Sequence, residues 1–350
     1  MKRVIKALLL FICIGCLFSI LNTQVTCETP KGSFWIEYID VGQGDSVLVQ
    51  CDGHYMLIDG GPSKASSTIY TILKKSGISY LDYIIATHPD SDHIGGLSGA
   101  LNYAKVGTCF CPVNDYETKT FKSLIKYLGK QNVGITYPKV NESILLGSAK
   151  VTFLGPITIS DDSNNSSIVV RVEYGNTSFL FMGDAEYEEE NEILHAGRDI
   201  KSDVIKLGHH GSASSTSEAL INAVNPKYAI ISVGKGNSYG HPTNEVLNRV
   251  SAHGIKIYRT DLNGDITIYS DGNKVDILCE KKSVEEIPTV TKTVPTGITY
   301  VINTNTKRFH YPDCSSVQQM KEKNKEYSTK TAEEIKNMGY KPCGNCKPYN

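Results

Sequence analysis

Residues 87–96 bring two imidazoles and two carboxylates together in one short stretch. The stretch reads Thr-His-Pro-Asp-Ser-Asp-His-Ile-Gly-Gly, and its candidate ligands are His88, Asp90, Asp92 and His93. Imidazole and carboxylate groups together suit Zn²⁺, with Mn²⁺ or Fe²⁺ as alternatives. A polar loop whose side chains only bond to one another would not need this density of ligands. We therefore predict a loop that binds one or two divalent metal ions.

Neighbouring segments must position this loop, and other strands add to it. An apolar run at 81–86 predicts a strand that ends just before the loop, and two glycines let the chain turn directly after it. Further candidate ligands follow predicted strands elsewhere: Asp184, His209, His210 and His241. Alone, an aspartate after a strand is more often a turn residue, and a histidine in a glycine-rich loop is more often on the surface. Their coincidence with the loop at 87–96 favours a dinuclear site at one edge of the sheets.

Short strand-like runs alternate with helical patterns from residue 33 to about 280. The predicted strands are at 35–41, 46–50, 55–58, 81–86, 150–154, 168–174, 178–182, 203–207 and 228–233. The predicted helices are at 67–76, 97–103, 120–129, 186–195, 216–224 and 244–252, before a closing hairpin through Asn263-Gly264. Strand clusters interleaved with helices predict an α/β fold, an αββα sandwich with two sheets covered by helices, in a domain at 30–280.

Five motifs in this region resemble those of the metallo-β-lactamase superfamily. The loop at 87–96 is similar to the superfamily motif His-x-His-x-Asp-His, with Asp90 where the second histidine usually stands. The other motifs lie at 39–46, 58–61, 182–186 and 208–212. Together they resemble the hydrolase domain of ComEC-type competence proteins and its soluble relatives, which include pneumococcal-type phosphorylcholine esterases.

The resemblance implies two metal ions and a set of ligands for each. The first ion would be held by His88, Asp90 and either His209 or His210, of which the position at the strand end favours His209. The second ion would be held by Asp92, His93 and His241, with Asp184 bridging the two. The third-motif histidine of many superfamily members would fall near residues 164–166, where there is none. The pair at 209–210 is its natural replacement.

The same ligands define the expected chemistry. Two Zn²⁺ ions lower the pKa of a shared water from about 15.7 to near 7, and Asp92 would orient that water and shuttle its proton. Four side chains lie near the ligands in sequence: Asn165, Lys206, Ser212 and Tyr239. Each could contact an anionic substrate, or each could be part of the solvated surface. The expected function is an exported metal-dependent hydrolase that favours phosphodiesters, with a nuclease as one form.

Three other functions stay open at this point. The first is cleavage of phosphorylcholine or another cell-surface phosphoester. The second is hydrolysis of a β-lactam or lactone, which Asp90 makes less favoured. The third is a surface protein or nucleic-acid-binding protein that keeps a metal-bound fold as a scaffold. The expected partner is a phosphoester substrate, DNA or a cell-wall polymer, and the multi-span channel region of the competence proteins is not seen here. The sequence does not indicate an oligomeric state.

The start of the chain predicts export. Residues 1–29 form a signal-peptide pattern, in which a basic start is followed by an uncharged apolar run at 7–21. That run is short for a membrane span, which needs roughly 20 residues. Cys16 and Cys27 would suit lipidation, but neither follows a convincing lipobox. The 350 residues suggest about two domains, and the net charge of −1 argues neither for nor against a nucleic-acid partner.

The end of the chain predicts a second, small domain. Residues 281–298 have two prolines and no hydrophobic periodicity, and we expect a linker. The unit at 299–350 carries His310, Cys314, Cys343 and Cys346, a pattern typical of structural zinc. It resembles the Ada-type metal-binding module, which adds a nucleic-acid association by analogy. A disulfide between two of the three cysteines is the alternative, favoured by export. Residues 281–350 hold twelve Lys/Arg against seven Asp/Glu, an excess that could contact a polyanion.

The cysteines of the main body leave two possibilities open. Cys109 and Cys111 are too close in sequence to bridge to each other easily. One of them could bridge to Cys51 or Cys279, or all four could be buried free thiols.

Overall fold

The computed structural model describes residues 34–281 and 300–350, apart from 313, 319, 345, 347, 349 and 350. The predicted signal peptide at 1–29 lies outside the described residues, as does the predicted linker apart from its first residue. Within the described ranges, every helix is too short or too polar to cross a membrane.

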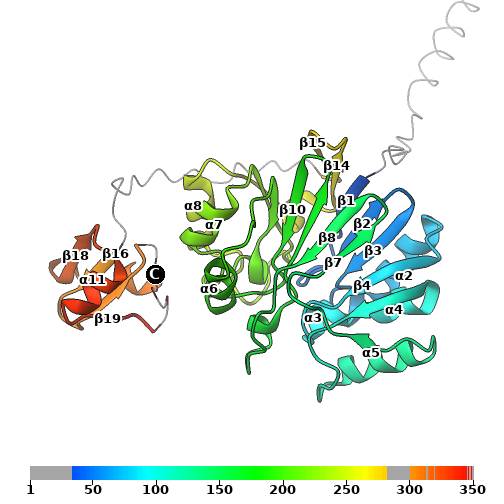
Figure 1. Cartoon of the computed structure of the whole chain (residues 1–350), viewed down its shortest axis with the longest axis horizontal. Coiled ribbons are helices and arrows are strands. Elements are labelled where there is room, and N and C mark those ends of the chain that lie inside the picture. The colour runs from blue at the N-terminus through cyan, green and yellow to red at the C-terminus, as the bar shows by residue number, and fades with distance from the viewer. Residues whose placement is uncertain are drawn as a thin grey trace, which may run out of the picture. The chain divides into compact units, whose positions relative to one another are not determined.

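The first of two large sheets has eight strands in the order β15-β14-β1-β2-β3-β4-β5-β6 (Figure 1). Its strands are β1 (Phe34–Tyr38), β2 (Val47–Cys51), β3 (His54–Ile58), β4 (Tyr80–Ile85), β5 (Lys105–Phe110), β6 (Ile135–Thr136), β14 (Ile266–Ser270) and β15 (Val275–Cys279). From β3 to β6 the strands run parallel. Their carboxyl ends therefore meet at one edge of the sheet, where the loop at 87–96 follows β4.

The second sheet has seven strands in the order β13-β12-β11-β10-β9-β8-β7. Its strands are β7 (Ser143–Leu146), β8 (Ala149–Phe153), β9 (Val170–Tyr174), β10 (Thr177–Phe181), β11 (Val204–Lys206), β12 (Tyr228–Ile231) and β13 (Lys256–Arg259). The strands β10 to β13 run parallel. The loops that follow their carboxyl ends contain the further candidate ligands. Asp184 follows β10, the 209–210 pair follows β11, and the segment at 234–241 follows β12.

Helices cover the outer faces of both sheets (Figure 1). On the first sheet they are α2 (Ser66–Lys75), α4 (Leu97–Tyr103) and α5 (Lys119–Gly129), and on the second they are α6 (Tyr187–His195), α7 (Glu218–Val224) and α8 (Asn244–Ala252). In α5 the hydroxyl of Thr118 caps the first turn, and Phe121, Leu124 and Leu128 are buried on one face. The predicted αββα sandwich is confirmed.

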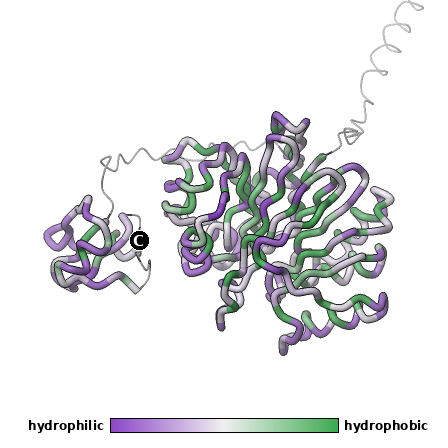
Figure 2. Tube along the Cα trace, viewed as in Figure 1, coloured by the Kyte–Doolittle hydropathy of each residue, from purple (hydrophilic) through white to green (hydrophobic). Residues whose placement is uncertain are grey.

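The core between the sheets follows from alternation along the strands. In β1 the buried residues Phe34, Ile36 and Tyr38 alternate with less buried ones. They join Phe179 and Phe181 of the second sheet in one apolar cluster. Figure 2 shows apolar residues running along these central strands. This packing fixes the two sheets face to face, and so brings their strand ends to a common edge.

The predicted closing hairpin through Asn263-Gly264 is wrong. There the chain forms α9 (Thr260–Asn263) and passes from β13 in one sheet to β14 in the other. The side chain of Asn263 is buried and accepts a hydrogen bond from the backbone N–H of Arg259 at 2.9 Å, so it terminates β13 rather than forming a hairpin turn. The hairpin itself joins β14 and β15, further along the chain.

The tail unit has its own sheet, with four strands in the order β18-β16-β17-β19. Its elements are β16 (Tyr300–Asn303), β17 (Arg308–His310), α10 (Ser315–Gln318), β18 (Lys325–Ser328), α11 (Ala332–Asn337) and β19 (Lys341–Pro342). The helix α11 starts at a capping box formed by Thr331 and Glu334. Its core consists of two small apolar clusters, one with Phe309 and Ile335 and one with Val301 and Val317, as expected for a unit of this size.

Candidate metal centre

The loop after β4 is held tightly against its neighbours. The backbone carbonyl of Thr87 accepts a hydrogen bond from Ile168 at 2.7 Å, and that of His93 accepts one from Gly60 at 2.7 Å. A Cβ on Gly96 would collide with the carbonyl oxygen of Gly60, so only glycine allows this approach. The side chains of the loop are therefore placed by backbone contacts rather than by chance.

Two groups of side chains converge at the common edge of the sheets. The first is His88, His93 and Asp184, and the second is Asp92, His93 and His210, with the donor atoms of each group within 4.8 Å of one another. One oxygen of Asp184, Oδ2, lies 3.2 Å from Nε2 of His93 and 3.4 Å from Nε2 of His210. The two groups share His93, and Asp184 connects them.

These residues fit divalent metal ions. The Nε2 atom of His88 and the Oδ1 atom of Asp184 are buried and have no hydrogen-bond partner among the described residues. Buried polar atoms without a partner are costly, and a bound ion would satisfy them. The set combines imidazole nitrogens with carboxylate oxygens, which suits Zn²⁺ and Mn²⁺.

Two of the imidazoles, those of His93 and His210, are oriented through their other nitrogen. Nδ1 of His93 lies 2.8 Å from Oδ2 of Asp59, and Nδ1 of His210 lies 2.9 Å from the carbonyl oxygen of Ser232 and 3.2 Å from Oδ1 of Asp45. A proton on Nδ1 donates to these oxygens and leaves Nε2 free to bind a metal. Asp45 and Asp59 lie in the motifs at 39–46 and 58–61, but no local pattern in the sequence predicts these roles for them.

Burial and neighbouring charges together set the pKa values of the buried histidines and of Asp184. Burial and the neighbouring His93 lower the pKa of His88 to about 3, so its ring is neutral at pH 7 and can bind a metal. Burial also disfavours the charged form of His210, but Asp184 and Asp45 outweigh it and raise its pKa to about 9. Burial alone would raise the pKa of Asp184, yet His210 and His93 hold it well below its usual range. Asp184 therefore stays ionised despite its burial.

Three predicted ligands lie beside these groups rather than in them. Oδ2 of Asp90 is 4.0 Å from Nε2 of His88, and its Oδ1 accepts a hydrogen bond from Ser163 at 3.0 Å. Nδ1 of His209 lies 2.9 Å from Glu186, with its Nε2 3.9 Å from Asp184. The ring of His241 packs against that of His209, with centroids 5.3 Å apart. Of the 209–210 pair, His210 groups with Asp92 and His93.

Lys206 is neither a solvated nor a substrate-facing side chain, contrary to both expectations for it. It is only 1% exposed. Its Nζ pairs with Oδ2 of Asp45, donates a hydrogen bond to the carbonyl oxygen of Gly183 at 2.9 Å, and lies 3.9 Å from Oδ1 of Asp184. Lys206 is thus a buried cation that is fully engaged behind the metal centre.

The tail unit brings its four predicted ligands together. The donor atoms of His310, Cys314, Cys343 and Cys346 all lie within 4.8 Å of one another, and all four side chains are buried. The three thiols are free, so the alternative of a disulfide is not what the structure shows. The donors fit a tetrahedral zinc site of the Cys₃His type. In the main body Cys51, Cys109, Cys111 and Cys279 are also free.

Replacing Cys343 with serine is expected to release the metal of the tail unit. Because the core of this unit is small, loss of one of four ligands should also open it to proteolysis. Metal content by mass spectrometry should fall by about one ion per chain, while hydrolysis by the main body is retained. Cys279→Ser, at a half-buried free thiol, is the matched control. Unchanged metal content and protease resistance in Cys343→Ser would contradict a metal at this cluster.

Comparisons with known proteins agree with the fold. The family model of the metallo-beta-lactamase superfamily matches residues 39–235. The chain is 33% identical over 284 residues to ComE operon protein 3 of Bacillus subtilis (strain 168), which covers 76% of this chain and 36% of that protein. It is 35% identical over 238 residues to Competence protein ComA of Neisseria gonorrhoeae, which covers 67% of this chain and 32% of that protein.

A third relative is also matched over most of this chain but over only part of its own length. Recombination protein 2 of Haemophilus influenzae (strain ATCC 51907 / DSM 11121 / KW20 / Rd) is 29% identical over 256 residues, which cover 71% of this chain and 30% of that protein. The chain spans about a third of the length of the curated relatives it matches. With its fold and its His/Asp groups, the chain belongs to the metallo-β-lactamase superfamily, as a metal-dependent hydrolase related to the competence proteins.

Proposed function

We propose that this chain hydrolyses phosphodiesters and that DNA is among its substrates. The observation that carries the proposal is the pair of donor groups that share His93 and are connected by Asp184. Such a pair suits two ions close together, and paired ions are well matched to in-line displacement at phosphorus. Relatives named as competence and recombination proteins support DNA as the polymer.

The buried side chains would bind the metal ions, and the more exposed Asp92 would also act on the attacking water. His88 and Asp184 would hold one ion, and Asp92, His93 and His210 the other. When bound, the ions supply an activated water as nucleophile and neutralise the charge of the phosphodiester. The side chain of Asp92 is 33% exposed, whereas those of His93, His210 and Asp184 are almost fully buried. Asp92 can therefore reach the attacking water and accept its proton.

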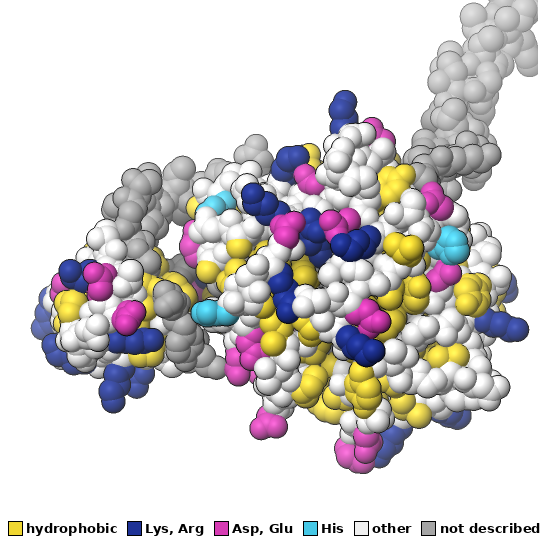
Figure 3. Space-filling model, viewed as in Figure 1, with side chains coloured by type: hydrophobic (Ala, Val, Ile, Leu, Met, Phe, Trp, Pro, Cys, Tyr) yellow, Lys and Arg dark blue, Asp and Glu magenta, His cyan; other side chains and the backbone are white. Residues whose placement is uncertain are grey.

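The tail unit would bind the DNA substrate through its basic side chains. The chain would act outside the cell. Figure 3 shows lysine and arginine side chains over the face of the tail unit that is in view. Residues 281–350 carry twelve Lys/Arg against seven Asp/Glu, which favours contact with phosphates. The basic and apolar start of the chain supports export. A cell-wall polyanion would meet the same charge, so DNA and such polymers need separate tests.

A substrate screen with Mn²⁺ or Zn²⁺ tests the reaction. We expect turnover of bis-p-nitrophenyl phosphate and of linear DNA, and none of nitrocefin. A chain that ends at Lys281 should retain ester hydrolysis but bind long DNA more weakly, because the basic tail is gone. The dependence of DNA affinity on salt should fall with it.

Three results would each count against one of these proposals. Faster turnover of p-nitrophenyl phosphorylcholine than of any nucleotide ester would favour a phosphorylcholine esterase. Hydrolysis of nitrocefin with no phosphodiester turnover would remove the phosphodiesterase proposal altogether. Unchanged DNA affinity in the shortened chain would remove the polymer-holding role of the tail and leave the reaction standing.

A further inference from the structure

The loop at 234–241 follows β12 and borders the metal centre through His241. The amide side chain of Asn237 holds this loop in shape. Its Nδ2 donates to the carbonyl oxygens of Gly234 at 3.0 Å and His241 at 2.6 Å. Its Oδ1 accepts from the backbone N–H groups of Tyr239 and His241, each at 3.1 Å. Four hydrogen bonds from one side chain make the loop a preformed turn rather than a mobile segment.

Tyr239 is presented at the tip of this turn. Its side chain is 68% exposed, the highest value among the exposed large hydrophobic residues in the part of the chain that the structure describes. Its ring stacks on the imidazole of His241, with centroids 5.8 Å apart and planes 28° from parallel. His241 in turn meets His209 edge-on, and His209 lies beside Asp184. A continuous row of rings thus leads from the metal centre to Tyr239.

An exposed charge on the same loop indicates the kind of ligand. Lys235 lies on the same loop, is exposed, and forms no ion pair with any described residue. A cation and an exposed ring on one short loop suit a nucleotide, since the ring can stack on the base while the ammonium attracts a phosphate. The same cation would repel a quaternary ammonium group that bound to this loop, which disfavours choline as the ligand.

We propose that Tyr239 is a stacking platform for a nucleobase next to the phosphodiester that is cut, with Lys235 as its phosphate contact. This assignment rests on the proposed phosphodiesterase function and names its substrate as single-stranded nucleic acid. The platform is sequence-tolerant because every base has an aromatic face. Because Asn237 fixes the turn in advance, little conformational freedom of the loop is lost on binding.

Binding of labelled oligonucleotides tests the platform without turnover. Fluorescence anisotropy in EDTA would compare hexathymidylate with an abasic hexamer that has the same phosphates. Tyr239→Ala should weaken binding of hexathymidylate by about 5- to 150-fold and leave the abasic hexamer within about twofold. Tyr239→Phe keeps the ring and should bind like the wild type.

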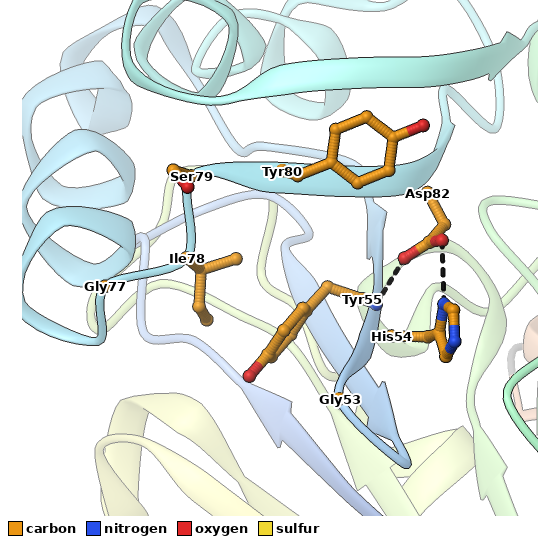
Figure 4. A pocket seen from close by; sticks show the side chains of 8 residues that line it. All are labelled: Gly53, His54, Tyr55, Gly77, Ile78, Ser79, Tyr80 and Asp82. Carbon is orange, nitrogen blue, oxygen red and sulfur yellow. Dashed lines mark hydrogen bonds and ion pairs between the residues drawn. The ribbon is translucent and has the colours of Figure 1, made fainter.

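Tyr80 provides a matched control. It is also an exposed tyrosine, at 50%, and lines a hollow of about 310 Å³ at the start of β4. Figure 4 shows it near Tyr55 and the Asp82 carboxylate, which is engaged by His54 and by the backbone of Tyr55. The hollow is at the opposite end of β4 from the metal centre, roughly 20 Å away along the strand. Tyr80→Ala should therefore leave both affinities unchanged.

The outcomes separate this proposal from the one it rests on. Equal weakening of both hexamers in Tyr239→Ala, or no weakening of either, would overturn the platform. Competition by phosphorylcholine that depends on the Tyr239 ring would overturn it too, in favour of a quaternary ammonium ligand. Base-dependent binding in a protein that cuts no phosphodiester would remove the enzymatic proposal and retain the platform. Phosphodiester turnover with base-independent binding would do the reverse.

Discussion

Replacing Asp184 with asparagine is expected to reduce kcat on bis-p-nitrophenyl phosphate on the order of 1,000-fold. Asparagine keeps the shape of the side chain but removes the charge that lies between His93 and His210. Because Asp184 connects the two donor groups, both ions should bind more weakly. Metal content, measured by mass spectrometry after dialysis, should fall together with activity.

The control for this variant is Asp276→Asn, which makes the same chemical change at an exposed position of β15. It should keep full activity and metal content. Far-UV circular dichroism should be the same for both variants and the wild type, because the αββα core does not depend on either side chain. If Asp184→Asn kept its metal and more than about a tenth of its activity, the bridging role would be wrong.

Replacing Lys206 with methionine is expected to lower the free energy of unfolding by about 3–5 kcal/mol. The substitution keeps the apolar stem but leaves the buried carboxylate of Asp45 without its cation. Burial raises the pKa of Asp45, and Lys206 with His210 more than reverses that effect. Without the ammonium, only His210 and His93 offset this buried charge. Urea unfolding in EDTA measures the loss without a contribution from bound metal.

A double substitution isolates the interaction. Lys206→Met combined with Asp45→Asn removes both charges, and it should be less destabilised than the sum of the two single variants. Strict additivity would show that Lys206 and Asp45 do not depend on each other. A Lys206→Met protein as stable as the wild type would show that the ammonium contributes nothing to the fold.

The general architecture could be predicted because it depends on local patterns. Alternation in β1 and the apolar face of α5 each reflect residues close together in the chain. The loop at 87–96 could be identified in the same way, since His88, Asp92 and His93 lie within six residues of one another, whereas Asp90 lies outside the donor groups. The position of Asp184 near the other ligands could be predicted because it follows a strand, and the loops after parallel strands lie at one edge of the sheet.

The choice within the 209–210 pair could not be predicted, because it depends on backbone conformation. Both residues have positive φ, 46° for His209 and 53° for His210, in the short turn at 208–211. The prediction favoured His209 because it comes directly after the strand, which would hold only if the chain stayed extended there. In the turn that forms instead, His209 is directed to Glu186, and His210 faces Asp92.

The supporting residues escaped prediction for a different reason. Asp59 and His93 are 34 positions apart, and Asp45 is far from both Lys206 and His210 in the chain. No local pattern pairs a carboxylate with one particular imidazole or ammonium group. The sequence placed Lys206 in an apolar strand, where its partner could be identified only once the two sheets were packed together.

The donor atoms of the metal centre come from both halves of the sandwich. His88 and His93 follow a strand of the first sheet, whereas Asp184 and His210 follow strands of the second. Neither half of the chain alone holds a complete set of ligands. Uptake of metal at this centre, as distinct from the Cys₃His cluster of the tail unit, would therefore report that the two sheets of a newly made chain have joined, and a nascent chain stopped before β10 would lack that signal.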